Sequence, residues 1–225
     1  MSPEAITADR IYSDLKRQIV GGNWRPGSIL AVTQIANHVG TSVTPVRDAI
    51  QKLVGEGFVA LLGTGGFFIP RITTRSMADL YGWHSDLVRL ALRDAQDIEA
   101  IGPFPGCEKP GFEQDIRHVV GLTEELFCRL AACSPNANHQ SALLTANDRL
   151  HVMRLHEPSP KRRAREIEVI WNALVSGNRN GARSMLWSYH RRRSLAVENI
   201  FRSMKRSGYV AESVELPVNE DDYKS

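Results

Sequence analysis

The apolar residues of this chain recur mostly at helical spacing. Residues 9–20 carry isoleucine or leucine at every fourth position and predict a first helix that ends at a Gly-Gly pair. Two shorter helical patterns follow, Val32–Val39 and residues 44–54, with a glycine between them. Their apolar positions form one face across both segments: 35, 36, 39, 43, 46, 50 and 53. Two packed helices joined by a tight glycine-containing turn are typical of a helix-turn-helix.

The second of these helices has a recognisable start, and a hairpin pattern follows it. Thr44 suits an N-cap and Pro45 the first helical position, where a missing N–H costs nothing. Two short apolar runs, Phe58–Leu62 and Phe67–Pro70, are joined by Gly63-Thr64-Gly65-Gly66. This pattern predicts a β-hairpin with a glycine-rich tip. Helix, helix-turn-helix and hairpin in this order predict a winged helix.

Beyond this segment the pattern is almost entirely helical. Ser76–Asp79 predicts a capping box, with Asp79 in the reach-back role that Glu usually takes. The predicted helices span 76–97, 113–133, 137–157, 161–177 and 179–205, and a loop rich in Gly and Pro covers 101–112. The expected fold is an N-terminal winged helix-turn-helix plus a C-terminal all-α helical bundle. The expected parts are the winged helix-turn-helix domain with its linker (1–75), the helical domain (76–208) and a flexible acidic tail (209–225).

Composition narrows the class of protein. Apolar residues make up 42% of the 225 positions and charged residues 24%, which excludes a wholly disordered chain. No stretch approaches the roughly 18 uninterrupted apolar residues that would span a bilayer, and the N-terminus lacks a secretory profile. Three cysteines, Cys107, Cys128 and Cys133, match no zinc or redox spacing. We therefore expect a soluble cytoplasmic protein with reduced thiols.

The positive charge is concentrated at one end. The net charge is +3, and residues 1–75 hold eight Lys/Arg against five Asp/Glu, so the surplus lies entirely in this third. A surplus of this size is weak support for a polyanionic partner. Two later basic runs, Lys161–Arg165 and Arg191–Arg193, lie near acids on predicted helices and are interpreted as solvated helix faces.

Several segments of the N-terminal third resemble the GntR family of transcriptional regulators. They are Ile11–Lys16, Arg25-Pro26-Gly27, Ile35–Gly40, Thr44–Leu53 and Gly55–Val59, and together they cover nearly all of residues 8–72. The remainder resembles the FCD effector domain of the FadR-like subgroup at Asp79–Tyr81, Leu126-Phe127 and Ile170–Asn178. The resemblance implies an all-helical domain that dimerises and carries a small-molecule pocket.

The second helix of a helix-turn-helix places its N-terminal residues against base edges in the major groove. The residues expected near DNA are Ser42, Thr44, Arg47, Asp48, Gln51 and the wing glycine Gly66. Arg47 suits a bidentate contact to guanine, and the hydroxyls of Ser42 and Thr44 suit phosphate oxygens. Where relatives often carry cationic residues, this chain has Val43, Thr33 and an uncharged wing tip. The alternative for Arg47 is an ion pair with Asp48 or Glu56 on a surface helix.

Many FCD domains bind a metal through an Asp and a His four residues apart, plus two later histidines. The resemblance places Glu124, Cys128, Ile167 and Tyr189 at these positions, with His190 one residue off. Ile167 has no donor atom, so we expect neither a metal nor another cofactor.

The remaining histidines suggest no replacement site. Asn147 and His151 are a lone i,i+4 pair, and His156 lies off their common face. His84 stands where many relatives have an inward-pointing Arg. The predicted effector pocket therefore involves His84, Glu124, Cys128 and Tyr189, with Trp83 and Trp187 beside them; the alternative is that these aromatics are plain core.

These patterns favour a metabolite-responsive repressor that binds a pseudo-palindromic, double-stranded operator as a homodimer. Its effector would be an organic acid or a related metabolite, and the protein would be cytoplasmic and associated with the bacterial nucleoid, with no membrane partner. One alternative is a DNA-binding dimer whose helical domain has lost ligand sensing and serves only assembly. A thiol or metal enzyme that uses Cys128 and His151 is disfavoured, because no phosphate loop, nucleophile elbow or carboxylate pair is present.

Overall fold

The structure, a computed structural model, describes residues 3–63, 65–106 and 115–211. The chain divides into two compact units: one comprises the chain up to Ile72 together with the segment from Lys205, and the other comprises Thr73–Met204. Thr64 of the predicted wing tip, Cys107 and the predicted acidic tail from residue 212 lie outside the described residues. No helix in the described ranges is long and apolar enough to cross a membrane.

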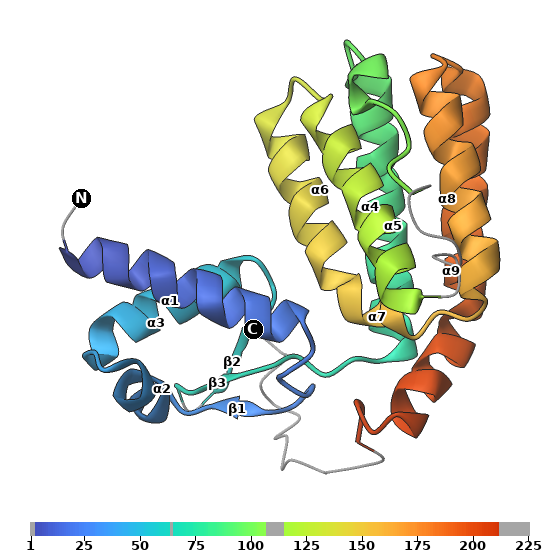
Figure 1. Ribbon diagram of the computed structural model, residues 1–225. Coiled ribbons are helices and arrows are strands. Elements are labelled where there is room, and N and C mark those ends of the chain that lie inside the picture. Colours follow the sequence, from blue (N-terminus) through green and yellow to red (C-terminus); the bar gives the residue numbers. More distant parts are fainter. Residues whose placement is uncertain (1–2, 64, 107–114, 212–225) are drawn as a thin grey trace. The chain divides into compact units, whose positions relative to one another are not determined.

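The first unit is a winged helix-turn-helix (Figure 1). Its elements are α1 (Pro3–Val20), β1 (Ile29–Leu30), α2 (Val32–Val39), α3 (Val43–Gly55), β2 (Ala60–Leu61) and β3 (Phe67–Phe68). The strands form an antiparallel sheet in the order β1-β3-β2, in which Phe67 of β3 lies opposite both Leu30 and Leu61. The predicted two-stranded hairpin therefore gains a third strand. At two residues, β1 is too short to show an alternating pattern in the sequence.

Apolar packing of α1 on α3 forms the core of this unit. Ile11 and Leu15 of α1 are buried against the same cluster as Ile50 and Leu53 of α3. Each such side chain contributes roughly 1.5–3 kcal/mol by burial. At the end of α3, Glu56 accepts a hydrogen bond from the Tyr12 hydroxyl and pairs with Lys16 of α1 at 2.9 Å. This core fixes which face of α3 remains exposed.

The turn between α2 and α3 corrects two predictions. Gly40 ends α2 in the left-handed region, at φ +71°, where glycine carries no steric penalty. The N-cap of α3 is Ser42, not Thr44, so Pro45 is the third helical residue rather than the first. Pro45 is still tolerated there because the first four N–H groups of a helix have no intrahelical partner. Val39 and Val43 are 47% and 37% exposed, so they do not belong to the buried face that the pattern predicted.

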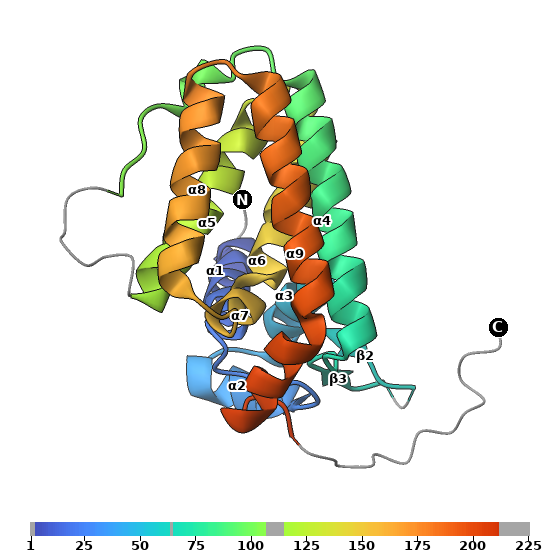
Figure 2. The same cartoon turned by 90° about the vertical axis from the view of Figure 1, so that its right-hand side faces the viewer.

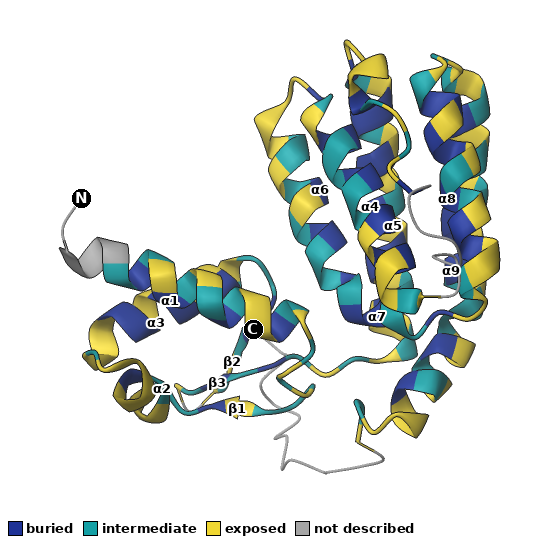
Figure 3. Cartoon of the chain, viewed as in Figure 1, coloured by how far each residue is buried: buried dark blue, intermediate teal, exposed yellow. Residues whose placement is uncertain are grey.

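The second unit is all-α in its described residues (Figure 2). Its elements are α4 (Thr74–Asp94), the 3₁₀ helix η1 (Glu99–Ile101), α5 (Ile116–Ala132), α6 (Ala137–Arg149), α7 (His151–Leu155), α8 (Pro160–Val175) and α9 (Arg179–Arg206). The helix α5 is central and packs against α4, α6, α7 and α8. Buried and exposed residues alternate around these helices with a helical period (Figure 3).

The start of α4 and the helix predicted over 137–157 differ from the predictions. The capping box at the start of α4 joins Thr73 and Ser76, each side chain accepting a hydrogen bond from the other's backbone N–H. Asp79 instead pairs with Arg75 one turn earlier on the surface. The single helix predicted over 137–157 divides at Leu150 into α6 and the five-residue α7.

Candidate nucleic-acid interface and the polar centre of the bundle

The five predicted DNA contacts on and before α3 share one exposed face. Ser42, Thr44, Arg47, Asp48 and Gln51 are all exposed, whereas Pro45, Val46, Ala49, Ile50 and Leu53 of the same helix are buried. The amphipathic pattern of α3 produces this division, because its apolar stripe must face α1. The N-terminal half of α3 therefore presents polar side chains to solvent, as a recognition helix must.

The side chain of Arg47 is oriented by the wing. Its guanidinium carbon lies 6.0 Å from the centroid of the Phe67 ring on β3, a contact worth about 0.5–1 kcal/mol at an exposed site. Among the described residues Arg47 forms no ion pair, and the acid Glu56 is engaged by Tyr12 and Lys16. The alternative of a surface ion pair for Arg47 is therefore not what the structure shows.

The start of α3 has an N-cap residue whose side chain does not cap the helix. Ser42 is the N-cap, yet its side chain makes no capping hydrogen bond. Helix N-termini attract anions through their unpaired N–H groups and the helix dipole. The wing glycine has a different role: the Gly66 carbonyl accepts the Leu62 N–H at 2.8 Å, and a Cβ at this position would lie 3.1 Å from Leu62 Cδ1. Gly66 closes the wing by this tight approach, and its contact with DNA stays a prediction.

In the second unit, sequence reasoning missed the residue at the centre, Arg154 of α7. Its guanidinium is fully buried and lies 5.4 Å from the Phe127 ring centroid. One terminal nitrogen donates to the Asn147 carbonyl at 3.1 Å and to Asn147 Oδ1 at 2.6 Å, and lies 3.6 Å from Glu124 Oε1. Its other terminal nitrogen lies 3.5 Å from His84 Nε2. A cation of the chain itself therefore occupies the polar interior of the bundle.

His84 extends this contact to α9. The distance from His84 Nδ1 to His190 Nε2 is 2.8 Å, and His190 Nδ1 lies 2.8 Å from the Leu186 carbonyl oxygen. Because a carbonyl can only accept, we assign the His190 proton to Nδ1, so His190 Nε2 accepts from His84 Nδ1–H. Burial lowers the pKa of His190 to about 3 and lowers that of His84 as well. Both rings are therefore neutral, and the polar contacts run from Arg154 to His84 to His190.

Two of the potential ligands at the positions implied by the family resemblance, Glu124 and Cys128, have partners within the protein. Glu124 lies 2.7 Å from His151 Nδ1, and Cys128 Sγ accepts from Asn147 Nδ2 at 3.4 Å. Ile167 is buried and apolar. Within the described ranges, no three His, Cys, Asp or Glu side chains are placed to hold a metal ion.

The two tryptophans expected beside the pocket lie at the surface, whereas Tyr189 is buried. Trp83 and Trp187 are 40% and 58% exposed, so they do not line the interior. Tyr189 is buried, but its hydroxyl has no hydrogen-bond partner among the described residues, and the guanidinium carbon of Arg193 lies 3.6 Å from its ring centroid. His190, one residue further along, makes the polar contact instead.

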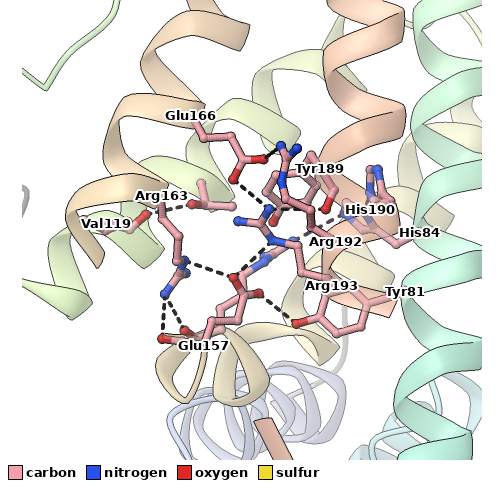
Figure 4. A network of polar contacts seen from close by, with 12 residues as sticks. Tyr81, His84, Val119, Glu157, Arg163, Glu166, Tyr189, His190, Arg192 and Arg193 are labelled. Atoms are coloured by element: carbon pink, nitrogen blue, oxygen red, sulfur yellow. Dashed lines mark hydrogen bonds and ion pairs between the residues drawn. The ribbon is translucent and has the colours of Figure 1, made fainter. Parts of the chain in front are cut away.

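A second buried network has a carboxylate at its centre (Figure 4). Glu157 accepts from the Tyr81 hydroxyl at 2.8 Å and pairs with Arg163 at 2.9 Å and Arg193 at 3.1 Å. Burial, and then the charge of Glu157, raises the pKa of Tyr81 well above its usual value. Arg193 also donates to Glu166 of α8 at 2.7 Å. The network ties α4, α8 and α9 together around one buried carboxylate.

The exposed face of α3 and its wing define the first unit as a winged helix-turn-helix DNA-binding domain. Residues 7–69 match the family model described as bacterial regulatory proteins, gntR family. This match identifies residues 7–69 as a DNA-binding domain of the gntR family.

Similar proteins extend the match beyond this domain. The chain is 26% identical over 188 residues to the uncharacterized HTH-type transcriptional regulator YdhC of Bacillus subtilis, covering 77% of this chain and 83% of the relative. It is 27% identical over 163 residues to the Nta operon transcriptional regulator of Aminobacter aminovorans, covering 70% and 78%. Among solved structures, E. coli McbR/YncC superposes with a TM-score of 0.62 at 17% identity, over 87% of this chain and 98% of that one. The last likeness shows the fold, and the sequence relatives indicate a transcriptional regulator.

Proposed function

We propose that this GntR-type regulator is a homodimer that binds a pseudo-palindromic operator and represses the adjacent genes. The observation that carries the proposal is the exposed face of α3, on which Arg47 is oriented by Phe67 and left without an ion pair among the described residues. The uncommitted N-terminus of α3 suits phosphate oxygens on either side of the groove. Ser42, Thr44, Asp48 and Gln51 share this face and complete the proposed contact.

A dimer is proposed because one winged helix makes few base contacts. Two-fold symmetric proteins match two-fold symmetric sites, and doubling the contacts raises specificity over random DNA. The helical unit is the proposed dimerisation domain, in keeping with its resemblance to FCD domains. A dimer seated on promoter DNA excludes polymerase sterically, so repression is the simplest outcome of binding.

The helical unit is also the proposed place of effector binding, and the effector is proposed to be an organic acid or a related metabolite. One observation favours the alternative of a unit that serves assembly alone. The interior positions Glu124, Cys128 and Asn147 are already engaged by other side chains, and Arg154 fills the space between them. Thermal shifts with organic acids separate these two functions, because a ligand that binds only the folded state raises the melting temperature by mass action.

A regulator of this kind would act in the bacterial cytoplasm on nucleoid DNA and would not be an enzyme. Burial raises the pKa of the Cys128 thiol, the reverse of what an activated nucleophile requires. The base that would serve it, His151, contacts Glu124 instead.

Selection of bound sequences from random DNA tests the proposed function. We expect a recovered consensus with two inverted half-sites, and an Arg47→Ala variant that fails to enrich it. Recovery of an asymmetric consensus would contradict the dimeric part of the proposal. Recovery of no consensus would contradict sequence-specific binding altogether.

A further inference from the structure

A large groove runs between α4 and α9 on the second unit, where these two helices lie side by side (Figure 2). Its volume is about 1140 Å³, enough for a molecule of drug size. The groove is separate from the interior positions Glu124, Cys128 and Ile167, none of which lines it. It therefore offers space that the packed centre of the bundle does not.

The walls of the groove are basic. Four arginines line it, Arg89, Arg93, Arg179 and Arg183, against one acid, Asp86. They are not equivalent. Arg179 donates to the carbonyls of Leu92 and Ala95 and so closes the end of α4, while Arg89 and Arg93 each pair with an acid on their own helix.

Of these four arginines, Arg183 is the one that has no partner among the described residues. It is exposed on the first turns of α9, and within the described parts of the chain it forms no ion pair or hydrogen bond. Guanidinium groups bind carboxylates through two parallel hydrogen bonds, a geometry that Arg183 is free to adopt.

The floor of the groove is apolar. Val88 and Leu92 of α4 and Leu186 of α9 are buried there, and Trp187 lies at the rim with more than half of its surface exposed. An exposed tryptophan beside an apolar floor favours a partner that has an apolar body as well as a charge. His190, the last residue of the polar series from Arg154, also lines the groove.

We propose that the α4–α9 groove binds a small organic anion, a carboxylate on an aliphatic or aromatic body, with Arg183 as its main charge contact. The proposal rests on the proposed function, since it assigns the effector's class and place. Charge decides between this occupant and a second copy of the chain. A two-fold interface at this groove would bring two sets of arginines together, and like charges in such a contact are unfavourable. A carboxylate instead offsets the unpaired positive charge, and its body covers Leu186 and Trp187.

The proposed ligand would also contact the interior. A molecule over His190 meets the ring that accepts from His84, whose other nitrogen faces Arg154. Binding is therefore coupled to the polar contacts that join α4, α7 and α9. Because both histidines are neutral, ligand binding would affect these contacts by moving the rings and not by changing their charge.

Calorimetric titration of the full-length protein tests the site. The probes are sodium butyrate, hexanoate, octanoate, benzoate and phenylacetate, each paired with its neutral primary amide at matched ionic strength. We expect at least one carboxylate to bind at least tenfold more tightly than its amide. Arg183→Gln should weaken that carboxylate at least tenfold, and Trp187→Ala should weaken carboxylates with larger bodies more than butyrate. Arg165→Gln, an exposed arginine on α8 outside the groove, is the matched control and should change nothing.

Three results would overturn the proposal. The first is that no carboxylate of the panel binds, and the second is that Arg183→Gln binds them like Arg165→Gln. The third is that Arg183→Gln or Trp187→Ala changes the oligomeric state by sedimentation, which would assign the groove to a second copy. Operator binding is measured on the same samples, so that failure of the groove proposal can be told apart from failure of the proposed function. Intact operator binding without carboxylate binding removes this site and leaves the regulator, whereas carboxylate binding without operator binding retains the site and removes the proposed function.

Discussion

Arg47 combines an exposed guanidinium with an orientation set by the Phe67 ring. We predict that Arg47→Ala weakens operator binding by about 1–3 kcal/mol and relaxes discrimination at one base pair in each half-site, because a bidentate contact to guanine is lost. Fluorescence anisotropy with specific and random duplexes measures both effects. If the mutant kept the wild-type ratio of specific to random binding, Arg47 would be a phosphate contact or a bystander.

The buried histidines lead to a second prediction about single residues, which concerns the pH dependence of stability. Burial lowers the pKa of His190 to about 3, below the unfolded value of about 6.5. The unfolded chain therefore binds more protons, and the stability of the fold declines as the pH falls below about 6.5 until it levels off near 3. His84 shifts in the same direction, because burial and the neighbouring His190 both lower its pKa.

Urea unfolding between pH 7 and pH 4 measures this dependence. We expect each buried histidine to contribute a slope of up to about 1.4 kcal/mol per pH unit. His190→Gln should reduce the slope, and His38→Gln, an exposed histidine of the first unit, should leave it unchanged. Equal slopes in all three proteins would show that His190 is not held neutral by its burial.

At the scale of elements, Glu157 joins three helices through buried ion pairs with Arg163 and Arg193 and a hydrogen bond from Tyr81. We predict that Glu157→Gln destabilises the fold by about 3–5 kcal/mol, because Arg163 would stay buried without its counter-charge and Arg193 would keep only Glu166. Chemical denaturation followed by circular dichroism measures the loss. Glu198→Gln, an exposed acid on α9, is the matched control and should change stability by less than about 0.5 kcal/mol. A loss for Glu157→Gln as small as the control's would mean that the network adds little to stability.

The distribution of the implied ligand positions over the helices explains why we expect the stability of the fold not to depend on a metal. The ligand positions implied by the family resemblance are spread over α5, α8 and α9, and Glu124 and Cys128 are engaged by His151 and Asn147. We predict that dialysis against a chelator leaves the melting temperature almost unchanged, because a weak site stabilises little by mass action. Near-stoichiometric zinc or nickel in untagged protein, with a large drop in melting temperature after dialysis, would contradict this prediction.

Elements that depend on neighbouring residues could be predicted from the sequence. Features that depend on residues far away in the chain could not. The winged helix was predictable because Gly40, the apolar stripe of α3 and the glycines of the wing are local signals. The two-residue strand β1 carries no pattern of its own and forms only by pairing with β3. Arg154 was missed because its partners lie 7 to 70 positions away, and a lone arginine on a short helix resembles a surface residue. The shift from Tyr189 to His190 shows that family positions locate a region, whereas packing decides which of two buried side chains makes the polar contact.

At the scale of the whole molecule, the last prediction concerns assembly. One winged helix presents a single recognition helix with one arginine near its start, Arg47, and no arginine at the neighbouring position 43. So few base contacts give little specificity against random DNA, whereas two copies on a two-fold site add their contacts. We therefore predict a stable homodimer at micromolar concentration, with light scattering giving twice the mass of the chain.

The prediction separates dimerisation from DNA contact. Arg47→Ala should remain dimeric while losing operator affinity, because this residue lies on the exposed face of the first unit. An operator with one half-site scrambled should bind much more weakly than the intact site, since the second recognition helix then makes only non-specific contacts. A monomer by light scattering, with undiminished affinity for the intact operator and no penalty for the scrambled half-site, would show that one winged helix suffices and that the helical unit has another purpose.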